Sequence, residues 1–316
     1  MLASATPRAG RSSAVVAELP TGPEWLHEVK WDGMRVLLDI REGEVRITAR
    51  SESTVTVAFP ELLGLGDLLP DALLDGEVVA MVDGRPSFSA LAERMHVQDR
   101  RKAERLAASR PVVLMIFDIL RLYGVALLDR PLEERRATLE RLELPGPAWQ
   151  VPPAYDDGPA LLAATREQGL EGVVSKRRTS TYQPGVRSKD WVKLPHLRVL
   201  SALVGGWRPE SGNERRIGAL LLGLPRNGEL DFVGRVGSGI SGPAAARLTE
   251  LLGPLARDTS PFADELPRLD AQGSRWVEPE VVVDVSYLGR TEANRLRQPT
   301  YRSLRADLGA DDVRWE

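Results

Sequence analysis

A lysine in the stretch EVKWDGMR (28–35) is the residue of this sequence with the clearest chemical potential. The chain has only five lysines among its 42 lysine and arginine residues, and Lys30 precedes an Asp-Gly pair and Arg35. Arginine stays protonated, whereas a lysine whose site lowers its pKa becomes an amine that can attack phosphorus or a carbonyl carbon. Lys30 is therefore a candidate nucleophile on phosphorus. A Schiff-base lysine and an ordinary surface lysine before a turn are the alternatives.

Two glutamates are candidates to assist such a lysine. Glu77 in DGEVVA (75–80) is expected on a strand directly after a turn, and Glu171 in EGVVSK (171–176) repeats that arrangement. Each alone reads as a turn or strand-edge residue. Beside a reactive lysine, the pair could hold a divalent ion, Mg²⁺ or Mn²⁺, against a triphosphate.

An aromatic residue and a second lysine complete the candidate set. Phe117 in FDIL (117–120) is expected at the end of a buried strand, as a core residue or as a platform that stacks on a purine. Lys193 in RSKDWVKLP (187–195) is expected on a strand, from which its ammonium could meet a phosphate.

The composition restricts the metal chemistry and the class of protein. The chain has no cysteine and three scattered histidines, so neither a disulfide nor a Cys- or His-rich metal site is expected. The net charge of −3 is unlike that of a nucleic-acid coat protein, although local basic clusters can still steer an anion. The arginines of 100–105 are expected on solvated helix surface. No apolar run approaches the ~18 residues of a membrane span, and the N-terminus lacks the apolar region of a secretory signal.

The residues up to about 196 are expected to form an α+β domain with antiparallel strands that position these groups. Strands are expected in 25–33, 34–40, 45–50, 111–120, 171–177 and 190–195. A β-hairpin segment is expected in 72–82, followed by a turn at 83–86. Helices are expected at 59–69, 87–108, 131–144 and 157–169 from periodicity, Pro131 and Gly169.

The pattern changes near Leu197 to short strands with one helix, expected at 242–257. Asn227-Gly228 predicts a hairpin turn. About 120 residues of this kind suit a small barrel, and the five-stranded OB-fold is the leading candidate. We therefore predict two domains, 1–196 and 197–316.

Seven stretches, taken together and in this order, resemble the motifs of the ATP-dependent DNA ligases within the covalent nucleotidyltransferase superfamily. The compact bacterial end-joining ligases and the ligase module of multifunctional bacterial repair ligases are the most similar in character. The stretches are EVKWDGMR (28–35), AR (49–50), DGEVVA (75–80), FDIL (117–120), EGVVSK (171–176), DWVKL (190–194) and RLRQPTYRSLRAD (295–307).

The resemblance implies a three-step reaction on ATP and DNA. Lys30 attacks the α-phosphate of ATP, forming a lysyl-AMP phosphoramidate and releasing pyrophosphate. AMP then moves to the 5′-phosphate of a nick, and the 3′-hydroxyl attacks that activated phosphate and expels AMP. An amine is required for the first step, which explains a lysine at position 30.

The resemblance also implies a role for each matching residue. The catalytic residues would be Lys30 and Lys193, with Lys193 on the α-phosphate. The metal ligands would be Glu171 and Glu77. The nucleotide site would comprise Glu28, whose main chain reads the adenine edge, Arg35 and Arg50 near the sugar or the nick phosphate, Glu77, Phe117 stacked on adenine, and Lys176. Pyrophosphate would be oriented by Arg302, Arg305 and Asp307.

Three positions depart from the family pattern. Pro195 replaces the second basic residue of its motif, and Leu308 stands where the last motif usually ends in lysine. Ser51-Glu52 follows Arg50 where small residues are usual, which would put a negative charge near the nick. These departures bear on self-adenylation more than on DNA binding.

Two other functions compete with a working ligase. An RNA ligase or an mRNA-capping enzyme shares the lysine motif and the two-domain plan, and a nick- or end-binding scaffold would follow if the catalytic cycle had decayed. The resemblance further implies a monomer on nicked or broken duplex DNA in non-homologous end joining, with bacterial Ku and a repair polymerase as partners. A bacterial cytoplasmic, nucleoid-associated location is expected.

Overall fold

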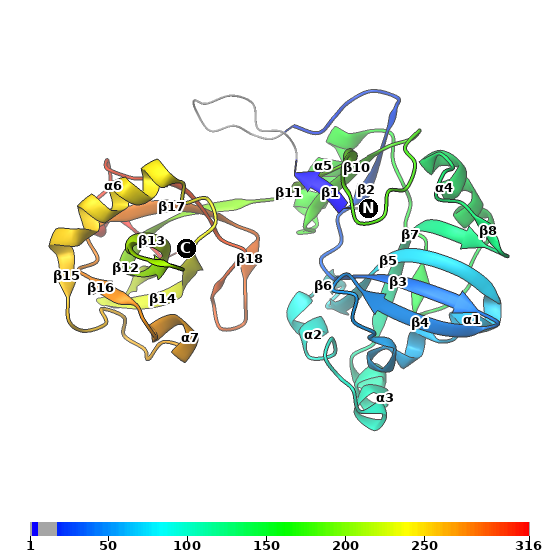
Figure 1. The fold of residues 1–316 in the computed structure, drawn as a ribbon, viewed down its shortest axis with the longest axis horizontal. Coiled ribbons are helices and arrows are strands. Elements are labelled where there is room, and N and C mark those ends of the chain that lie inside the picture. The colour runs from blue at the N-terminus through cyan, green and yellow to red at the C-terminus, as the bar shows by residue number, and fades with distance from the viewer. Residues whose placement is uncertain (1, 6–17, 316) are drawn as a thin grey trace. The chain divides into compact units, whose positions relative to one another are not determined.

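The computed structural model describes residues 2–5 and 18–315 of the chain. It divides into two units, Met1–His196 and Leu197–Glu316, called here the N-terminal and the C-terminal unit (Figure 1). Each has its own apolar core. Within the described residues, no helix has both the length and the apolar character needed to cross a membrane.

The larger of the two sheets in the N-terminal unit has seven strands. Its strands are β3 (Met34–Arg41), β4 (Glu44–Ala49), β5 (Asp71–Val82), β6 (Arg85–Pro86), β7 (Val112–Leu122), β8 (Val125–Ala126) and β9 (Trp149–Gln150). The order is β4-β3-β5-β7-β8, with β6 on β5 and β9 on β7. Leu38, Leu74 and Ile116 from its central strands are fully buried in the core that the sheet covers.

A smaller sheet carries the candidate lysines. Its strands are β1 (Leu2–Ala5), β2 (Trp25–Val29), β10 (Gly172–Arg177) and β11 (Arg187–Pro195), in the order β1-β11-β10-β2. β10 runs antiparallel to both β2 and β11, and it pairs Val173 with Val29 and Val174 with Lys193. This register brings the end of β2, where Lys30 follows, close to Lys193.

Two expectations about strand ends are wrong. β5 runs without a turn through Asp75-Gly76, and a β-bulge in its pairing with β7 lies at that point instead. A Cβ at Gly76 would lie 2.8 Å from the Met115 carbonyl oxygen, so glycine permits the close approach of the two strands. Phe117 stands in the middle of β7, not at its end. The turn at 83–86 is confirmed, with Asp83 and Gly84 at positive φ.

Two of the four expected helices form as predicted. α4 (Leu132–Arg141) begins after Pro131, and α5 (Gly158–Glu167) begins at Asp157, whose carboxylate accepts from Ala160 N at 2.9 Å. Gly169, at φ 68°, follows the end of α5.

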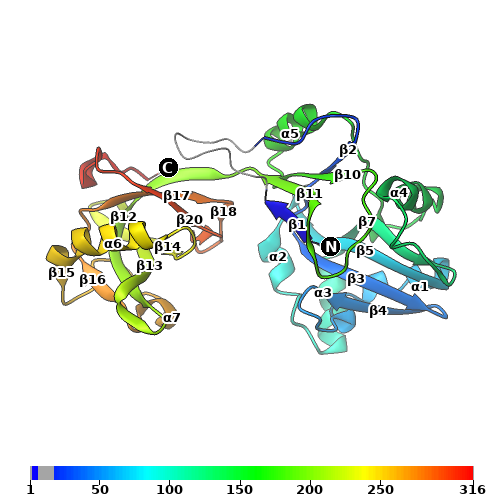
Figure 2. The same ribbon diagram turned by 45° about the horizontal axis from the view of Figure 1, so that its top comes forward.

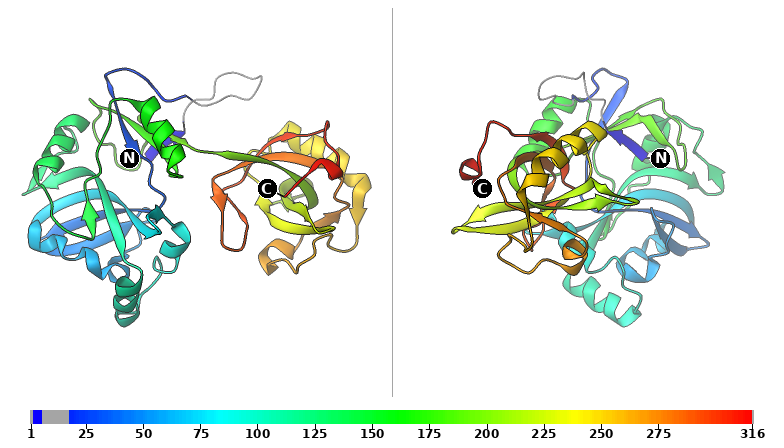
Figure 3. Two further views of the ribbon diagram at one scale, coloured as in Figure 1. Left: turned by 180° about the vertical axis from the view of Figure 1, so that it is seen from behind. Right: turned by 60° about the vertical axis from the view of Figure 1, so that its left-hand side comes forward.

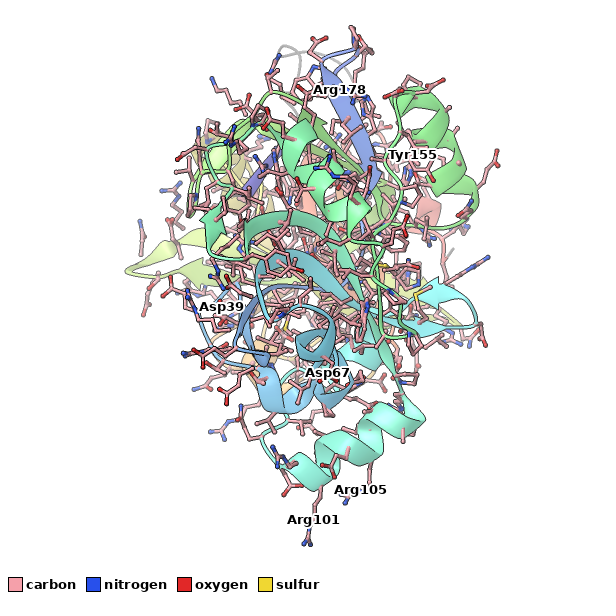
Figure 4. The ribbon with its side chains drawn as sticks, turned by 90° about the vertical axis from the view of Figure 1, so that its right-hand side faces the viewer. Asp39, Asp67, Arg101, Arg105, Tyr155 and Arg178 are labelled. Atoms are coloured by element: carbon pink, nitrogen blue, oxygen red, sulfur yellow. The ribbon has the colours of Figure 1, made fainter. Side chains whose placement is uncertain are left out.

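The helices expected at 87–108 and 59–69 are both interrupted. The first is two helices, α2 (Phe88–Ala92) and α3 (Arg100–Ser109), and the second is one 3₁₀ turn, Pro60–Leu62, and a single α-helical turn, α1 (Leu65–Leu68). The break between α2 and α3 contains Arg94, whose buried guanidinium donates to the carbonyls of Ala58 and Arg110. These tertiary contacts of Arg94 stabilise the break, although the periodicity of 87–108 favours one continuous helix. Arg101 and Arg105 project from α3 into solvent, as expected (Figure 4).

The C-terminal unit is built around the long strand β12 (Arg198–Glu210). β12 pairs with β13 on one edge and with β17, then β16, on the other. The pairing shifts at Gly205, where a Cβ would lie 2.6 Å from the Phe262 ring, so glycine allows the strand to bend against its core. The other strands are β13 (Asn213–Arg226), β14 (Glu229–Val236), β15 (Ala256–Arg257), β16 (Arg275–Val277), β17 (Val282–Tyr287), β18 (Gly289–Arg290), β19 (Leu296–Arg297) and β20 (Thr300–Leu304).

Turns and two helices join the strands of the C-terminal unit (Figures 2 and 3). Asn227 and Gly228 both have positive φ and join β13 to β14, which confirms the predicted hairpin. α6 (Gly242–Leu252) packs on β13 and ends before Pro254, so it is shorter than the expected 242–257. α7 (Arg268–Ala271) is a single turn before β16.

Candidate active site

A cavity of about 610 Å³ in the N-terminal unit contains most of the predicted site residues. Its walls come from the loop after β2, the ends of β3 and β4, the middle of β5 and β7, and the strands β10 and β11. The predicted residues that line it are Glu28, Lys30, Arg35, Arg50, Glu77, Phe117, Lys176 and Lys193.

Lys30 lies directly after β2, with its side chain in this cavity. Its ammonium forms an ion pair with Glu171, and its backbone N–H donates to the Gly172 carbonyl at 2.9 Å. Three residues on, a Cβ at Gly33 would lie 2.2 Å from the Val78 carbonyl oxygen. Only glycine therefore lets this loop lie against β5, which carries Glu77.

Glu77 is the second carboxylate near the lysine. It pairs with Arg35 across the β3–β5 ladder, and the charges of Lys30, Arg35 and Glu171 affect its pKa. Burial raises the pKa of Glu77 to about 8, although Lys30 and Arg35 oppose the shift. A carboxyl that titrates near neutral pH is a common property of functional sites.

Arg35 is held by a buried acid that the sequence did not single out. Asp75, with no exposed surface, accepts from Arg35 Nε at 2.9 Å and from a second guanidinium nitrogen at 2.5 Å. The Tyr182 hydroxyl donates to the same carboxylate at 2.8 Å. Such a bidentate contact fixes the plane of a guanidinium, so the orientation of Arg35 is set before any ligand binds.

An aromatic corner closes the cavity around Phe117. The Trp191 ring meets Phe117 edge to face, with centroids 6.1 Å apart. Lys176 Nζ lies 4.4 Å from the centroid of Phe117 and 4.2 Å from that of Trp191. It also lies 2.6 Å from Glu28 Oε2. Burial lowers the pKa of Lys176, and Glu28 counteracts that shift. Flat apolar faces beside polar groups suit a purine.

The loop after β4 presents Arg50, Ser51 and Ser53 to the cavity. Glu52 lies between the two serines at φ 66°, and its backbone N–H donates to the Ala49 carbonyl at 2.9 Å. The residues that line the cavity are thus the neighbours of Glu52. Glu52 itself is exposed beside these cavity residues, and a negative charge near the nick stays a prediction.

The last predicted group, Arg302, Arg305 and Asp307, belongs to the C-terminal unit. Arg305 donates to Asp307 at 2.9 and 2.8 Å and contacts Asp284 at 3.3 Å. Its hydrogen bonds lower the pKa of Asp307 to about 2. Leu308, where a lysine was expected, packs against the apolar core of this unit.

Sequence reasoning missed four residues of the cavity region: Asp75, Tyr182, Trp191 and His96. Trp191 and His96 line the cavity, and Asp75 and Tyr182 hold Arg35 from behind. Two of them stood inside quoted stretches, DGEVVA and DWVKL, and could have been found there. Tyr182 has no local signal, because its partners Asp75 and Arg35 are far away in sequence. His96 has none, because the other predicted residues of the cavity come from distant segments.

A metal ion in this cavity would need phosphate oxygens of the substrate as further ligands. No group of three or more acidic, histidine or cysteine residues with suitable geometry occurs among residues 2–5 and 18–315. Glu77 and Glu171 are two carboxylates next to Lys30, which suits Mg²⁺ because that ion usually takes one or two carboxylates and completes its shell with phosphates and water.

Comparisons with known families place both units. Residues 1–194 match the ATP dependent DNA ligase domain, and residues 213–308 match the ATP dependent DNA ligase C terminal region. The chain is 40% identical over 297 residues to the multifunctional non-homologous end joining protein LigD of Mycolicibacterium smegmatis, covering 93% of the chain and 37% of that protein. It is 35% identical to DNA ligase C2 of the same organism, covering 90% of the chain and 86% of that protein.

Solved structures agree with these matches. The ligase domain of M. tuberculosis LigD is 38% identical, with a TM-score of 0.54 over 100% of this chain and 97% of that one. A Lig E DNA ligase, 17% identical, shares the fold with a TM-score of 0.63 over 96% and 98% of the two chains. The predicted α+β unit followed by an OB-fold region is thereby confirmed.

Proposed function

The chain belongs to the ATP-dependent DNA ligases, and from that premise we propose how its residues divide the reaction. Lys30 Nζ attacks the α-phosphorus of ATP, a P–N bond forms, and the bond to the pyrophosphate oxygen breaks. The observation that carries this assignment is the position of Lys30. It lines the cavity directly after β2, paired with Glu171 and near enough to Glu77 to affect the pKa of that acid, in the cavity that Phe117 also lines.

The cavity supports a distinct role for each side. We assign the aromatic corner of Phe117 and Trp191 to the purine, with the main chain at Glu28 against its edge. Lys193 lies on β11 opposite Val174 and lines the same cavity as Lys30. From there its ammonium would neutralise charge on the α-phosphate as pyrophosphate leaves. Arg35, fixed by Asp75, would bind the ribose or the acceptor phosphate.

The divalent ion belongs at Glu171 and Glu77 in this proposal. When bound there, it would neutralise phosphate charge and compete with the Glu171–Lys30 ion pair, which favours the free amine of Lys30. The Glu171 carboxylate can then no longer hold the ammonium form in place. Arg302, Arg305 and Asp307 are assigned to the pyrophosphate leaving group.

We infer a role in DNA repair by end joining from the relatives. The chain spans 37% of the length of the LigD proteins, whose names describe them as multifunctional and end-joining, and 86% of DNA ligase C2. Sealing of nicks or breaks in duplex DNA is therefore proposed for this chain. Ku and a separate polymerase are proposed partners. A cytoplasmic, nucleoid-associated location follows from a DNA substrate.

Intact-mass measurement tests the first step. The protein is treated with pyrophosphate to remove any bound AMP, then incubated with ATP and Mg²⁺ without DNA. Wild type should gain one AMP and Lys30→Ala none, because alanine offers no nucleophile. Lys189→Ala, at an exposed lysine of the same chain, is the matched control and should gain AMP normally. AMP on Lys30→Ala would refute the assignment.

A nick with a pre-adenylated 5′-phosphate separates ligase from scaffold. It bypasses the first step, so sealing should persist in the presence of Pro195 and Leu308 even if self-adenylation is slow. Tight binding with no sealing from either substrate would favour the scaffold. Parallel nicks with RNA strands would reveal an RNA ligase.

A further inference from the structure

A cluster of hydrogen-bond donors lies at one edge of the cavity, away from the aromatic corner. Arg50, Ser51 and Ser53 come from the loop after β4, and His96 comes from the turn between α2 and α3. All four line the cavity, and all four are exposed to solvent. Two elements far apart in sequence thus present donors to one place.

Strand register places this cluster at the end of the cavity opposite the aromatic corner of Phe117 and Trp191. Ala49 pairs with Val36, Val36 with Gly76, and Gly76 with Ile116. Arg50 therefore follows the edge strand β4, whereas Phe117 is three strands away on β7. Strands lie about 4.8 Å apart, so the two ends of the cavity are separated by about 14 Å. A group bound at Arg50 is thus distinct from a base stacked on Phe117.

The two serines are pre-arranged to donate. The Ser51 and Ser53 hydroxyl oxygens lie 2.8 Å apart, and the loop is closed by the hydrogen bond from Ala49 N to the Ser53 carbonyl at 2.9 Å. One hydroxyl hydrogen suffices for the contact between the two serines. The other hydroxyl can therefore donate to a ligand without losing it.

The turn that carries His96 is anchored by Arg94. Arg94, two residues earlier, is fully buried and forms an ion pair with Glu61. Its guanidinium also donates to the Ala58 carbonyl at 2.7 Å and to the Arg110 carbonyl at 3.0 Å, and it lies over the Phe59 ring. These contacts tie the turn of His96 to the segment that follows the Arg50 loop. The backbone of the turn that carries His96 is therefore anchored at the cavity edge.

We propose that His96, together with the Ser51–Ser53 hydroxyl pair, binds the 5′-phosphate of the nick beside Arg50. This inference rests on the proposed ligase function. A terminal phosphate monoester has three free oxygens and up to two negative charges, whereas an internal diester has two oxygens and one charge. A guanidinium, a hydroxyl and an imidazole from two elements match the terminal group better. The other source of phosphate, ATP, is tested separately below.

The test compares two nicked duplexes that differ only in the 5′-group, phosphate or hydroxyl. Binding is measured by fluorescence anisotropy for wild type, His96→Ala, His96→Gln and Gln98→Ala. Gln98 is exposed on the same turn and serves as the matched control. His96→Ala should weaken binding of the 5′-phosphate nick about tenfold, the loss of one hydrogen bond to a charged group. The 5′-hydroxyl nick should bind with unchanged affinity, and His96→Gln should recover part of the loss.

Chemistry gives a second readout that separates the two phosphate sources. AMP transfer from preformed lysyl-AMP enzyme to the nick should slow in His96→Ala, whereas self-adenylation by ATP should stay within about twofold of wild type. A defect confined to self-adenylation would assign His96 to ATP and overturn the proposal. Equal losses on both duplexes, or no loss, would also overturn it. Failure of wild type to self-adenylate would instead count against the proposed function, and the binding comparison would still decide the role of His96.

Discussion

The two units of this ligase treat buried charge in opposite ways. The N-terminal unit buries charged side chains within and behind its cavity, among them Asp75, Asp118, Arg135 and Lys176. In the described part of the C-terminal unit, the buried polar side chain is Ser286, and the core is otherwise apolar. Ion pairs there range from partly buried, such as Arg305–Asp284, to Arg247–Glu250, with both side chains more than 60% exposed.

The difference indicates that the buried ion pairs of the N-terminal unit serve to orient reactive groups and add little to stability. A buried ion pair loses hydration that its mutual attraction only roughly offsets, so it is a poor way to stabilise a domain. It does fix polar groups in one orientation. In the N-terminal unit, the Lys176–Glu28 pair lies next to Phe117 and Asp75 pairs with Arg35. Both pairs fix the orientation of groups that are assigned to the nucleotide or the acceptor phosphate. The C-terminal unit gains most of its stability from apolar burial.

Breaking the buried pair Asp118–Arg135 should have the largest effect. Both side chains have no exposed surface, and Asp118 accepts from Arg135 at 2.8 and 2.9 Å. Asp118→Ala leaves a buried guanidinium without its carboxylate, so we expect the free energy of unfolding of the N-terminal unit to fall by about 3–5 kcal/mol. Urea unfolding followed by tryptophan fluorescence measures the change.

The surface pair of the C-terminal unit is the matched control. Glu250→Ala removes one partner of Arg247 and should change the free energy of unfolding by less than about 1 kcal/mol. If the two variants cost the same, the contrast between the units would not hold. The double variant Asp118→Ala/Arg135→Met should recover part of the loss, since no unpaired charge remains.

A core truncation in the barrel should come next in size. Leu222 on β13 is fully buried in the apolar core of the C-terminal unit. Leu222→Ala should destabilise that unit by about 3 kcal/mol through lost burial and a residual cavity. Self-adenylation at 20 °C should fall only in step with unfolding of the C-terminal unit, because Arg302, Arg305 and Asp307 of that unit are assigned to pyrophosphate. Unchanged AMP uptake with that unit unfolded would contradict the assignment of those three residues.

Features fixed by neighbouring residues could be predicted from the sequence. Lys30, Glu171 and Lys193 each lie in a short local motif, whose resemblance to ligase motifs predicted a shared site, and the pairing of β2, β10 and β11 brings the three together. Asn227-Gly228 forms its turn because both residues tolerate positive φ. Their individual catalytic roles remain predictions.

Features fixed by distant contacts could not be predicted in this way. Tyr182 reaches Asp75 across 107 positions of sequence, and nothing local marks Tyr182 as a support for Arg35. The same holds for Arg94, whose buried contacts interrupt a region with helical periodicity. Asp75-Gly76 looks like a turn but lies inside β5, because cross-strand pairing overrides the local preference of that pair.

The last expected effect is a pH dependence of the N-terminal unit, followed over the narrow window of pH 7 to 8.5, where only part of it appears. Burial raises the pKa of Glu77 from its ordinary 4.5 to about 8, so the folded state favours the protonated acid. Without metal, the stability contributed by this group is fully present below pH 4.5 and is lost as pH rises through about 8. Metal binding needs the carboxylate, so affinity for Mg²⁺ should rise with pH, by at most tenfold per unit, and level off above about 8.

Measurements between pH 7 and 8.5 isolate this group, because burial lowers the pKa of His27 and His196 below their ordinary 6.5. In the C-terminal unit, the pKa of Asp307 lies near 2 and that of Tyr301 is raised above 10, so stability there should stay flat across the same window. Glu77→Gln should abolish the slope of Mg²⁺ affinity, measured by the metal dependence of AMP uptake. A slope that persists in Glu77→Gln would assign the titration to another residue and remove Glu77 from the metal site.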